Sequence, residues 1–160
     1  MSNEFEQSIA IRAPAELVWA YLSQVELMKA WMSGPEMGLE IETDWKVGAP
    51  ITMRGFHHTS FTNTGKVLAF NPETRLVYTH LSSLSRLPEE PESYVTFEFI
   101  LIPEQRDTIL KLKAIGSPTM SIFKHLEFYW RTALETLKQH VQEAEKNSGT
   151  GNVATFYSKR

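Results

Sequence analysis

Two adjacent histidines, His57 and His58, stand in the segment RGFHHTSF and are the first residues in the chain that could do chemistry. Imidazole side chains bind metal ions and exchange protons near neutral pH. If a strand that begins near Ile51 continues through this segment, His57 projects inward together with Met53, whereas His58 projects outward. Side chains on opposite faces of a strand cannot share one metal ion, so we predict no metal site here.

The remaining motif chemistry is also sparse. The other histidines, at positions 80, 125 and 140, show neither the HExxH motif nor the His-x-x-x-His spacing that brings two imidazoles together on a helix. The chain has no cysteine, which excludes disulfides, thiolate metal sites and cysteine nucleophiles. We find no Gly-rich phosphate loop and no GxSxG motif. We therefore predict no catalytic residue and no cofactor.

Two polar rings are better placed for binding. The segment RLVYTH places Tyr78 and His80 on one face of a predicted strand. Together with His57 they could orient a carbonyl or hydroxyl group in an apolar pocket, or act as acid and base. The alternative is that His57 and His80 lie at strand ends, where they are solvated or bonded to main-chain carbonyls. The sequence leaves both interpretations open.

Large apolar side chains could line a pocket around these polar groups, and the same side chains could fill that space as ordinary core. The candidate ligand-binding residues are Trp31, Met53, His57, Tyr78, His80, Phe97, Phe99, Ile122, Phe123, Leu126 and Trp130. As a set, this aromatic and aliphatic bulk suits a small apolar or amphipathic ligand.

The elements that would position these residues follow from hydrophobic periodicity. A strand around Ile9 and Ile11 precedes two short helices, the second of which is VELMKAWM. Between residues 38 and 115 the apolar period changes to two, which predicts about six consecutive strands joined by hairpins. The segments of these strands are LEIET, PITMR, GKVLAF, RLVYTH, ESYVTFEFIL and TILKLKAI.

One long helix should follow the strands. Residues 120–146 contain no Gly or Pro, and their apolar side chains recur at helical spacing through Trp130 to Val141. A helix of this length spans about 40 Å, enough to cross a sheet. The predicted fold is therefore α+β: a curved antiparallel sheet wrapped around a long C-terminal helix, with Trp130 facing Phe97 and Phe99.

Composition indicates a soluble, cytoplasmic domain. Sixteen basic and nineteen acidic side chains give a formal charge of −3, without the basic excess that nucleic-acid binding requires. We see no signal peptide and no apolar run long enough to span a membrane. We expect a single domain over residues 1–146, followed by a loose tail at 147–160. The stretch at 81–93 is long for a hairpin connection and is either a lid or a surface insertion.

Four segments together resemble the START-like helix-grip superfamily, also called SRPBCC. They are IRAPAELVWAYLSQVELMKAWM, WKVGAPITMRG, GKVLAFNPETRLVYTH and YWRTALETLKQHV. The resemblance covers roughly residues 6–145, and the most similar subgroup contains proteins related to the C-terminal domain of the activator of the heat-shock-protein-90 ATPase.

The resemblance implies the helix-grip fold and permits three functions. The apolar candidate lining and the lack of a catalytic motif favour a non-enzymatic carrier or sensor, which holds a small hydrophobic or amphipathic molecule between the sheet and the C-terminal helix. One alternative is a cyclase-like or hydratase-like enzyme that uses Tyr78, His57 or His80. The other is a co-chaperone domain with a chaperone partner. A homodimer is compatible with all three.

Overall fold

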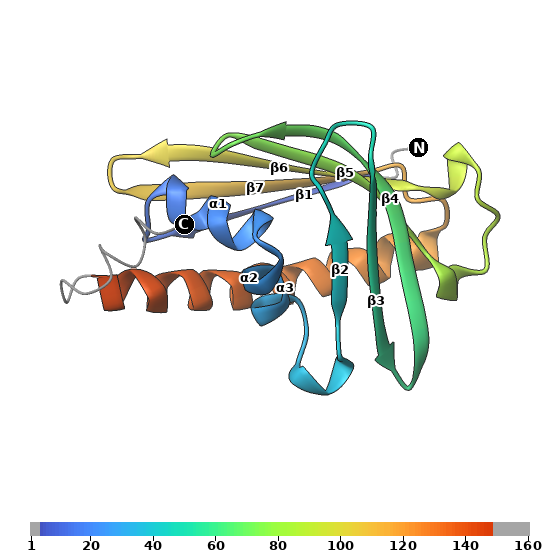
Figure 1. The fold of residues 1–160 in the computed structure, drawn as a ribbon. Helices are drawn as coiled ribbons and strands as arrows, with labels where there is room; N and C mark the ends of the chain where they lie inside the picture. Colours follow the sequence, from blue (N-terminus) through green and yellow to red (C-terminus); the bar gives the residue numbers. More distant parts are fainter. Residues whose placement is uncertain (1–3, 149–160) are drawn as a thin grey trace.

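One seven-stranded antiparallel sheet and one long helix dominate the structure, a computed structural model that describes residues 4–148 (Figure 1). The sheet order is β1-β7-β6-β5-β4-β3-β2, so consecutive strands are neighbours from β2 to β7 and β1 joins at the far edge. The strands are β1 (Phe5–Ile11), β2 (Glu40–Thr43), β3 (Pro50–His57), β4 (Thr59–Asn71), β5 (Arg75–Ser82), β6 (Val95–Glu104) and β7 (Asp107–Ile115).

Three α-helices and three short 3₁₀ turns complete the described residues. Their bounds are α1 (Ala15–Ser23), α2 (Val25–Met32), α3 (Met120–Ser148), η1 (Pro35–Met37), η2 (Ser83–Ser85) and η3 (Pro91–Ser93). The predicted helix-grip fold is confirmed. Helix α3 includes residues 147 and 148 of the predicted loose tail, and the rest of that tail lies outside the described residues. Between residues 4 and 148, no helix is both long enough and apolar enough to cross a membrane.

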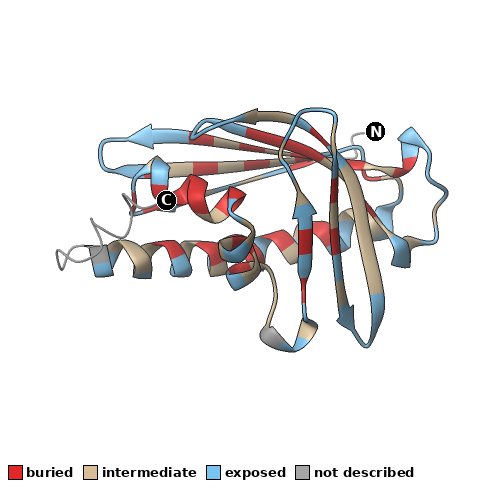
Figure 2. Ribbon diagram, viewed as in Figure 1, coloured by how far each residue is buried: buried red, intermediate tan, exposed pale blue. Residues whose placement is uncertain are grey.

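Periodicity explains why the core lies between the sheet and α3. Strand β6 buries every second side chain from Val95 to Leu101, and β7 buries Leu110 and Leu112 between partly exposed lysines. Helix α3 buries a stripe from Leu126 to Val141 at helical spacing. Figure 2 shows the buried residues along the sheet and on the side of α3 that it covers.

Strand β1 is bonded to α3 as well as to β7. The Gln7 side-chain amide donates a hydrogen bond from Nε2 to the main-chain carbonyl of Glu127, at 2.9 Å. Near the other end of the strand, the Arg12 main-chain N–H donates to Oε1 of Gln142 at 2.8 Å. These two bonds connect the first strand to the last helix at two separate positions along both elements.

The sheet turns sharply within β4. Figure 1 shows β2, β3 and the first part of β4 running across α3, whereas β6 and β7 run along it. The pairing of β4 with β5 is irregular between Val67 and Ala69. Gly65 lies just before this point, and a Cβ atom there would come within 1.7 Å of the main-chain oxygen of Thr79. The next residue, Lys66, donates its main-chain N–H to Oγ1 of Thr79 at 2.9 Å. Glycine is therefore required where β4 presses against β5.

We predict that Gly65→Ala lowers the free energy of unfolding by about 3 kcal/mol or more, because the new methyl group must displace main-chain atoms rather than a side chain. Gly34→Ala is the matched control, since a Cβ at Gly34 meets only the movable Glu36 carboxylate. Its effect should stay below about 1 kcal/mol. Urea unfolding followed by circular dichroism measures both, and equal losses would show that close packing at Gly65 does not shape the sheet.

Candidate functional site

The candidate site is built around Phe97, on the inner face of β6. Its ring contacts three others: Tyr78 at a centroid distance of 5.8 Å, His80 at 5.2 Å and Trp130 at 5.3 Å. Tyr78 and His80 are neighbours on β5, paired with Phe97 and Val95 across the strands. With Phe99 and Tyr129 these residues form what we call the Phe97 cluster, comprising Tyr78, His80, Phe97, Phe99, Tyr129 and Trp130.

Trp130 joins the sheet side of this cluster to the helices. Its side chain is 2% exposed, and its ring lies 5.6 Å from Phe99, 5.2 Å from Tyr129 and 6.1 Å from Trp31 of α2. The predicted orientation of Trp130 toward Phe97 and Phe99 is confirmed. Its indole Nε1 is buried without a hydrogen-bond partner among the described residues. Buried indole N–H groups usually have one.

Burial keeps the titratable rings of the cluster uncharged. It lowers the pKa of His80 to about 4, and the nearby His125 of α3 lowers it further in the same direction. Burial also raises the pKa of Tyr78 above its usual range, with a smaller contribution from Tyr129. The pKa of Tyr129 rises to about 12 for the same reason, while its hydroxyl donates to the carbonyl of Met32 at 3.2 Å. At neutral pH these groups offer hydrogen bonds without charge.

The other predicted pocket residues lie in or against the core. Trp31, Met53 and Leu126 are buried, and Ile122 and Phe123 are partly buried against the same core. The Trp31 indole donates to the carbonyl of Tyr21 at 2.8 Å, so its polar atom is satisfied within the protein. Whether these side chains contact a ligand stays a prediction.

His57 does not lie against the Phe97 cluster and instead has the exposed strand-end position of the alternative interpretation. Strand β3 ends at His57, and His58 has a left-handed conformation (φ 66°) in the hairpin that leads directly into β4. His57 is exposed there, away from the Phe97 cluster. The two imidazoles do not point to opposite sides either, because their rings lie 4.5 Å apart. Strand β3 keeps its regular pairing with β4 as far as His57 and Thr59, but residues 56–60 are all exposed, so this end of the hairpin lies outside the core. No group of three metal-binding side chains occurs in the described part of the chain.

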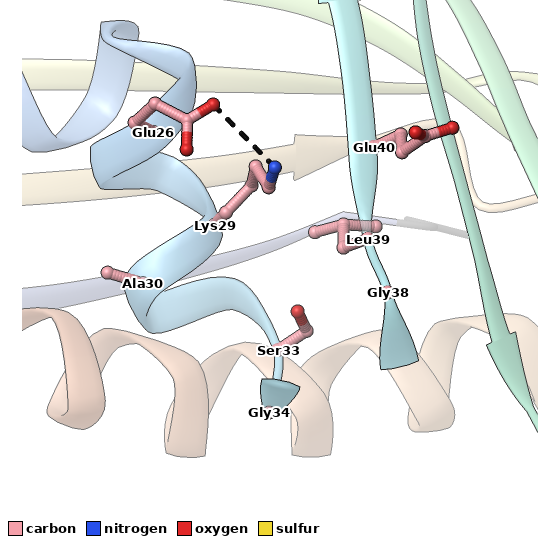
Figure 3. Close-up of a pocket in the computed structure, with 8 residues that line it drawn as sticks. All are labelled: Glu26, Lys29, Ala30, Ser33, Gly34, Gly38, Leu39 and Glu40. Carbon is pink, nitrogen blue, oxygen red and sulfur yellow. Dashed lines mark ion pairs between the residues drawn. The ribbon is translucent and has the colours of Figure 1, made fainter. Parts of the chain in front are cut away.

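An open cleft lies between α2 and β2, where the turned part of the sheet leaves the helices (Figure 3). Its volume is about 520 Å³. The residues that line it are Glu26, Lys29, Ala30, Ser33, Gly34, Gly38, Leu39 and Glu40. Lys29 and Glu26 form an ion pair of 3.6 Å at its rim. The sequence prediction missed this cleft, although the glycines on either side of the η1 turn mark a segment without large side chains.

Comparison with protein families agrees with this architecture. Residues 12–142 match the family described as Activator of Hsp90 ATPase homolog 1-like protein, a span that includes α1, the strands β2 to β7 and most of α3. The chain belongs to this family. The resemblance predicted from the sequence is thus confirmed at the level of superfamily and subgroup.

Solved structures of similar fold come from several bacteria. A protein from Cytophaga hutchinsonii is 29% identical, with a TM-score of 0.74 over 89% of this chain and 96% of its own. One from Chromobacterium violaceum is 19% identical, with a TM-score of 0.76 over 88% and 97%. One from Nitrosomonas europaea is 22% identical, with a TM-score of 0.71 over 88% and 94%. None of the curated proteins compared with the chain matches it.

We predict that Trp130→Ala lowers the free energy of unfolding by roughly 3–5 kcal/mol, because truncation empties a space bounded by four other aromatic rings. Phe128→Ala is the control on the same helix: Phe128 is 69% exposed, and its loss should change stability by less than about 0.5 kcal/mol. Urea unfolding measures both. A Trp130→Ala loss of only about 1–2 kcal/mol would mean that the ring borders open space instead.

His80 should make stability depend on pH. The pKa of His80 is about 4 in the folded protein and 6.5 in the unfolded chain. As the pH falls, His80 is therefore protonated in the unfolded chain before it is protonated in the folded protein, which favours unfolding. The free energy of unfolding of the wild type should fall by up to about 3 kcal/mol as the pH falls from 6.5 to 4. Above pH 6.5, His80 should not change it. His80→Gln should flatten that part of the profile, whereas the exposed-site control His57→Gln should follow the wild type. Identical profiles for all three proteins would contradict the role given to His80.

Proposed function

We propose that the protein binds a small hydrophobic or amphipathic molecule between the sheet and α3, as a non-enzymatic carrier or sensor. The bound molecule would contact the Phe97 cluster and reach it through the cleft between α2 and β2. Apolar walls with a few convergent polar groups are typical of small-molecule sites in proteins. Membership of a helix-grip family supports the proposal at the level of the fold only.

The observation that carries the proposal is the placement of Tyr78 and His80 on the inner face of the sheet. Both rings contact Phe97 within an otherwise apolar wall, and burial opposes their charged forms. Apolar side chains at these positions would stabilise the core without that cost. Two uncharged hydrogen-bonding groups in such a wall are suited to orient the polar end of an amphipathic molecule.

Acid–base catalysis by these residues is less well supported. An effective catalytic group has a pKa close to the working pH. The pKa of His80, at about 4, and the raised pKa of Tyr78 both move away from neutrality. His57, the third candidate of the enzymatic alternative, lies exposed at the β3–β4 hairpin. The geometry therefore favours binding over proton transfer.

Chaperone binding, the remaining alternative, has little structural support. The family description names an activator of Hsp90, but that activity belongs to the protein so described. On α3 the exposed apolar side chains Met120 and Phe128 are eight residues apart, with Lys124 between them on the same side of the helix. This arrangement does not define a contiguous apolar surface, so we do not propose this function.

The entry route can be tested by narrowing the cleft. Ala30 lines it and is exposed, so Ala30→Phe adds bulk without disturbing the core. Ala10→Phe, on the exposed side of β1, is the matched control. We expect wild type and control to bind 2-ethylnaphthalene with one site per chain. Ala30→Phe should lower both association and dissociation rates by about tenfold, a barrier change of roughly 1.4 kcal/mol.

Stopped-flow quenching of tryptophan fluorescence measures these rates, and native mass spectrometry of protein from its own host tests for a bound natural molecule. Unchanged rates in Ala30→Phe would remove the cleft as the entry route. Protein that is always isolated empty, and that binds neither 2-ethylnaphthalene nor any molecule in a host lipid extract, would contradict the proposed function itself.

A further inference from the structure

The indole of Trp130 has an unused hydrogen-bond donor in the middle of the proposed binding site. Trp31 and Trp45 are also largely buried, and each donates its Nε1–H to a main-chain carbonyl, at 2.8 Å to Tyr21 and at 2.6 Å to Ser23. Trp130 is 2% exposed and its Nε1 has no partner among residues 4–148. The recorded ring neighbours of Trp130 are Trp31, Phe97, Phe99 and Tyr129.

An unpaired buried donor costs free energy, because it has lost its hydrogen bond to water without replacing it. The cost disappears if a bound molecule supplies an acceptor. Phe97 contacts Trp130 and also contacts Tyr78 and His80. The indole therefore lies close to two polar rings, although it has no hydrogen-bond partner of its own among the described residues. Phe97 and Trp130 are 1% and 2% exposed, so a molecule reaches these rings only if the cluster opens. It would then lie near the indole, the phenol and the imidazole together.

The interior also restricts the charge of that molecule. The polar side chains that are buried in the described part of the chain are Ser23, Ser93, Thr108 and Ser117, so no lysine, arginine, aspartate or glutamate is among them. A carboxylate brought into this space would find no buried lysine or arginine to pair with, and an ammonium group would find no buried carboxylate. Desolvating an unpaired charge is far more costly than desolvating a carbonyl group.

We propose that the ligand of this protein is an uncharged molecule with a hydrogen-bond acceptor, such as a ketone, aldehyde, ester or ether oxygen on an apolar body, and that Trp130 Nε1 donates to this oxygen. This inference rests on the proposed function and narrows it from amphipathic molecules in general to neutral ones. Fatty acids and other anions are excluded as preferred ligands, because the Phe97 cluster supplies donors without positive charge. Trp130 is then a specificity-determining residue in addition to its part in the core.

Three naphthalene probes of nearly the same shape test the proposal: 2-acetylnaphthalene carries an acceptor, 2-ethylnaphthalene carries none, and 2-naphthoate carries a charge. Calorimetric titration of the wild type should give the acetyl compound the highest affinity, about fivefold or more above the ethyl compound, as one net hydrogen bond provides. The naphthoate should bind at least about tenfold more weakly than the acetyl compound.

Trp130→Phe keeps an aromatic ring and removes the N–H, so this variant should bind 2-acetylnaphthalene and 2-ethylnaphthalene with about equal affinity. Trp45→Phe also removes an indole N–H, but one already bonded to Ser23, and should retain the wild-type preference. Because Trp130→Phe could fold poorly, a second readout uses the wild type: in two-dimensional ¹H–¹⁵N NMR spectra, the Trp130 indole proton should move downfield with the acetyl compound and not with the ethyl compound.

The outcomes separate the two proposals. Equal binding of acetyl and ethyl probes by the wild type, with no selective shift of the Trp130 indole proton, would overturn the assignment of Trp130 while leaving apolar binding intact. That result would mean that the N–H is directed at the face of a neighbouring ring. Tightest binding of 2-naphthoate would overturn the neutral-ligand inference. If none of the three probes and no molecule of the host extract binds, the proposed function itself is contradicted.

Discussion

Packing between Trp130 and the phenylalanines of β6 is the contact on which the arrangement of this protein depends. A long helix covers a sheet only if its apolar stripe finds a matching surface, and Trp130 meets Phe97 and Phe99 at 5.3 and 5.6 Å. The same indole contacts Trp31, so α2 is positioned against α3 by the residue that positions α3 against the sheet. Core and candidate site therefore share one side chain, so truncation of Trp130 changes the stability of the fold as well as the lining of the candidate site.

The turn of the sheet within β4 gives this packing its shape. A sheet without the turn would lie along α3 on one side only, whereas here β2, β3 and part of β4 cross the helix (Figure 1). The crossing separates β2 from α2, and the cleft lies between these two elements. Gly65, where a side chain would collide with β5, allows β4 to pack closely against its neighbour beside this crossing.

Periodicity predicts this fold well because burial and sequence spacing are directly linked. The alternation from Val95 to Leu101 and the helical stripe through Trp130 each predict both an element and its buried face, and the structure confirms them. His57 shows where such reasoning ends, since alternation along β3 does not reveal whether that end of the strand is covered by the rest of the protein. The cleft could not be predicted because it depends on the angle between β2 and α2. Roles in ligand binding for the candidate residues stay predictions, because burial among aromatics is compatible with both core and pocket.

The bonds between β1 and α3 have a consequence for how the chain reaches this structure. Phe5 pairs with Ala114 in the sheet, and Gln7 bonds to Glu127 of α3, so the first strand acquires its partners only after the last elements exist. During synthesis β1 stays unpaired while the hairpins from β2 to β7 form, because the contacts within those hairpins are close in sequence. Closure of the core is then a late event that follows release of α3 from the ribosome. In this interval the free edge of β7 is open to pairing with another chain, which makes nascent β1 a natural segment for chaperone protection.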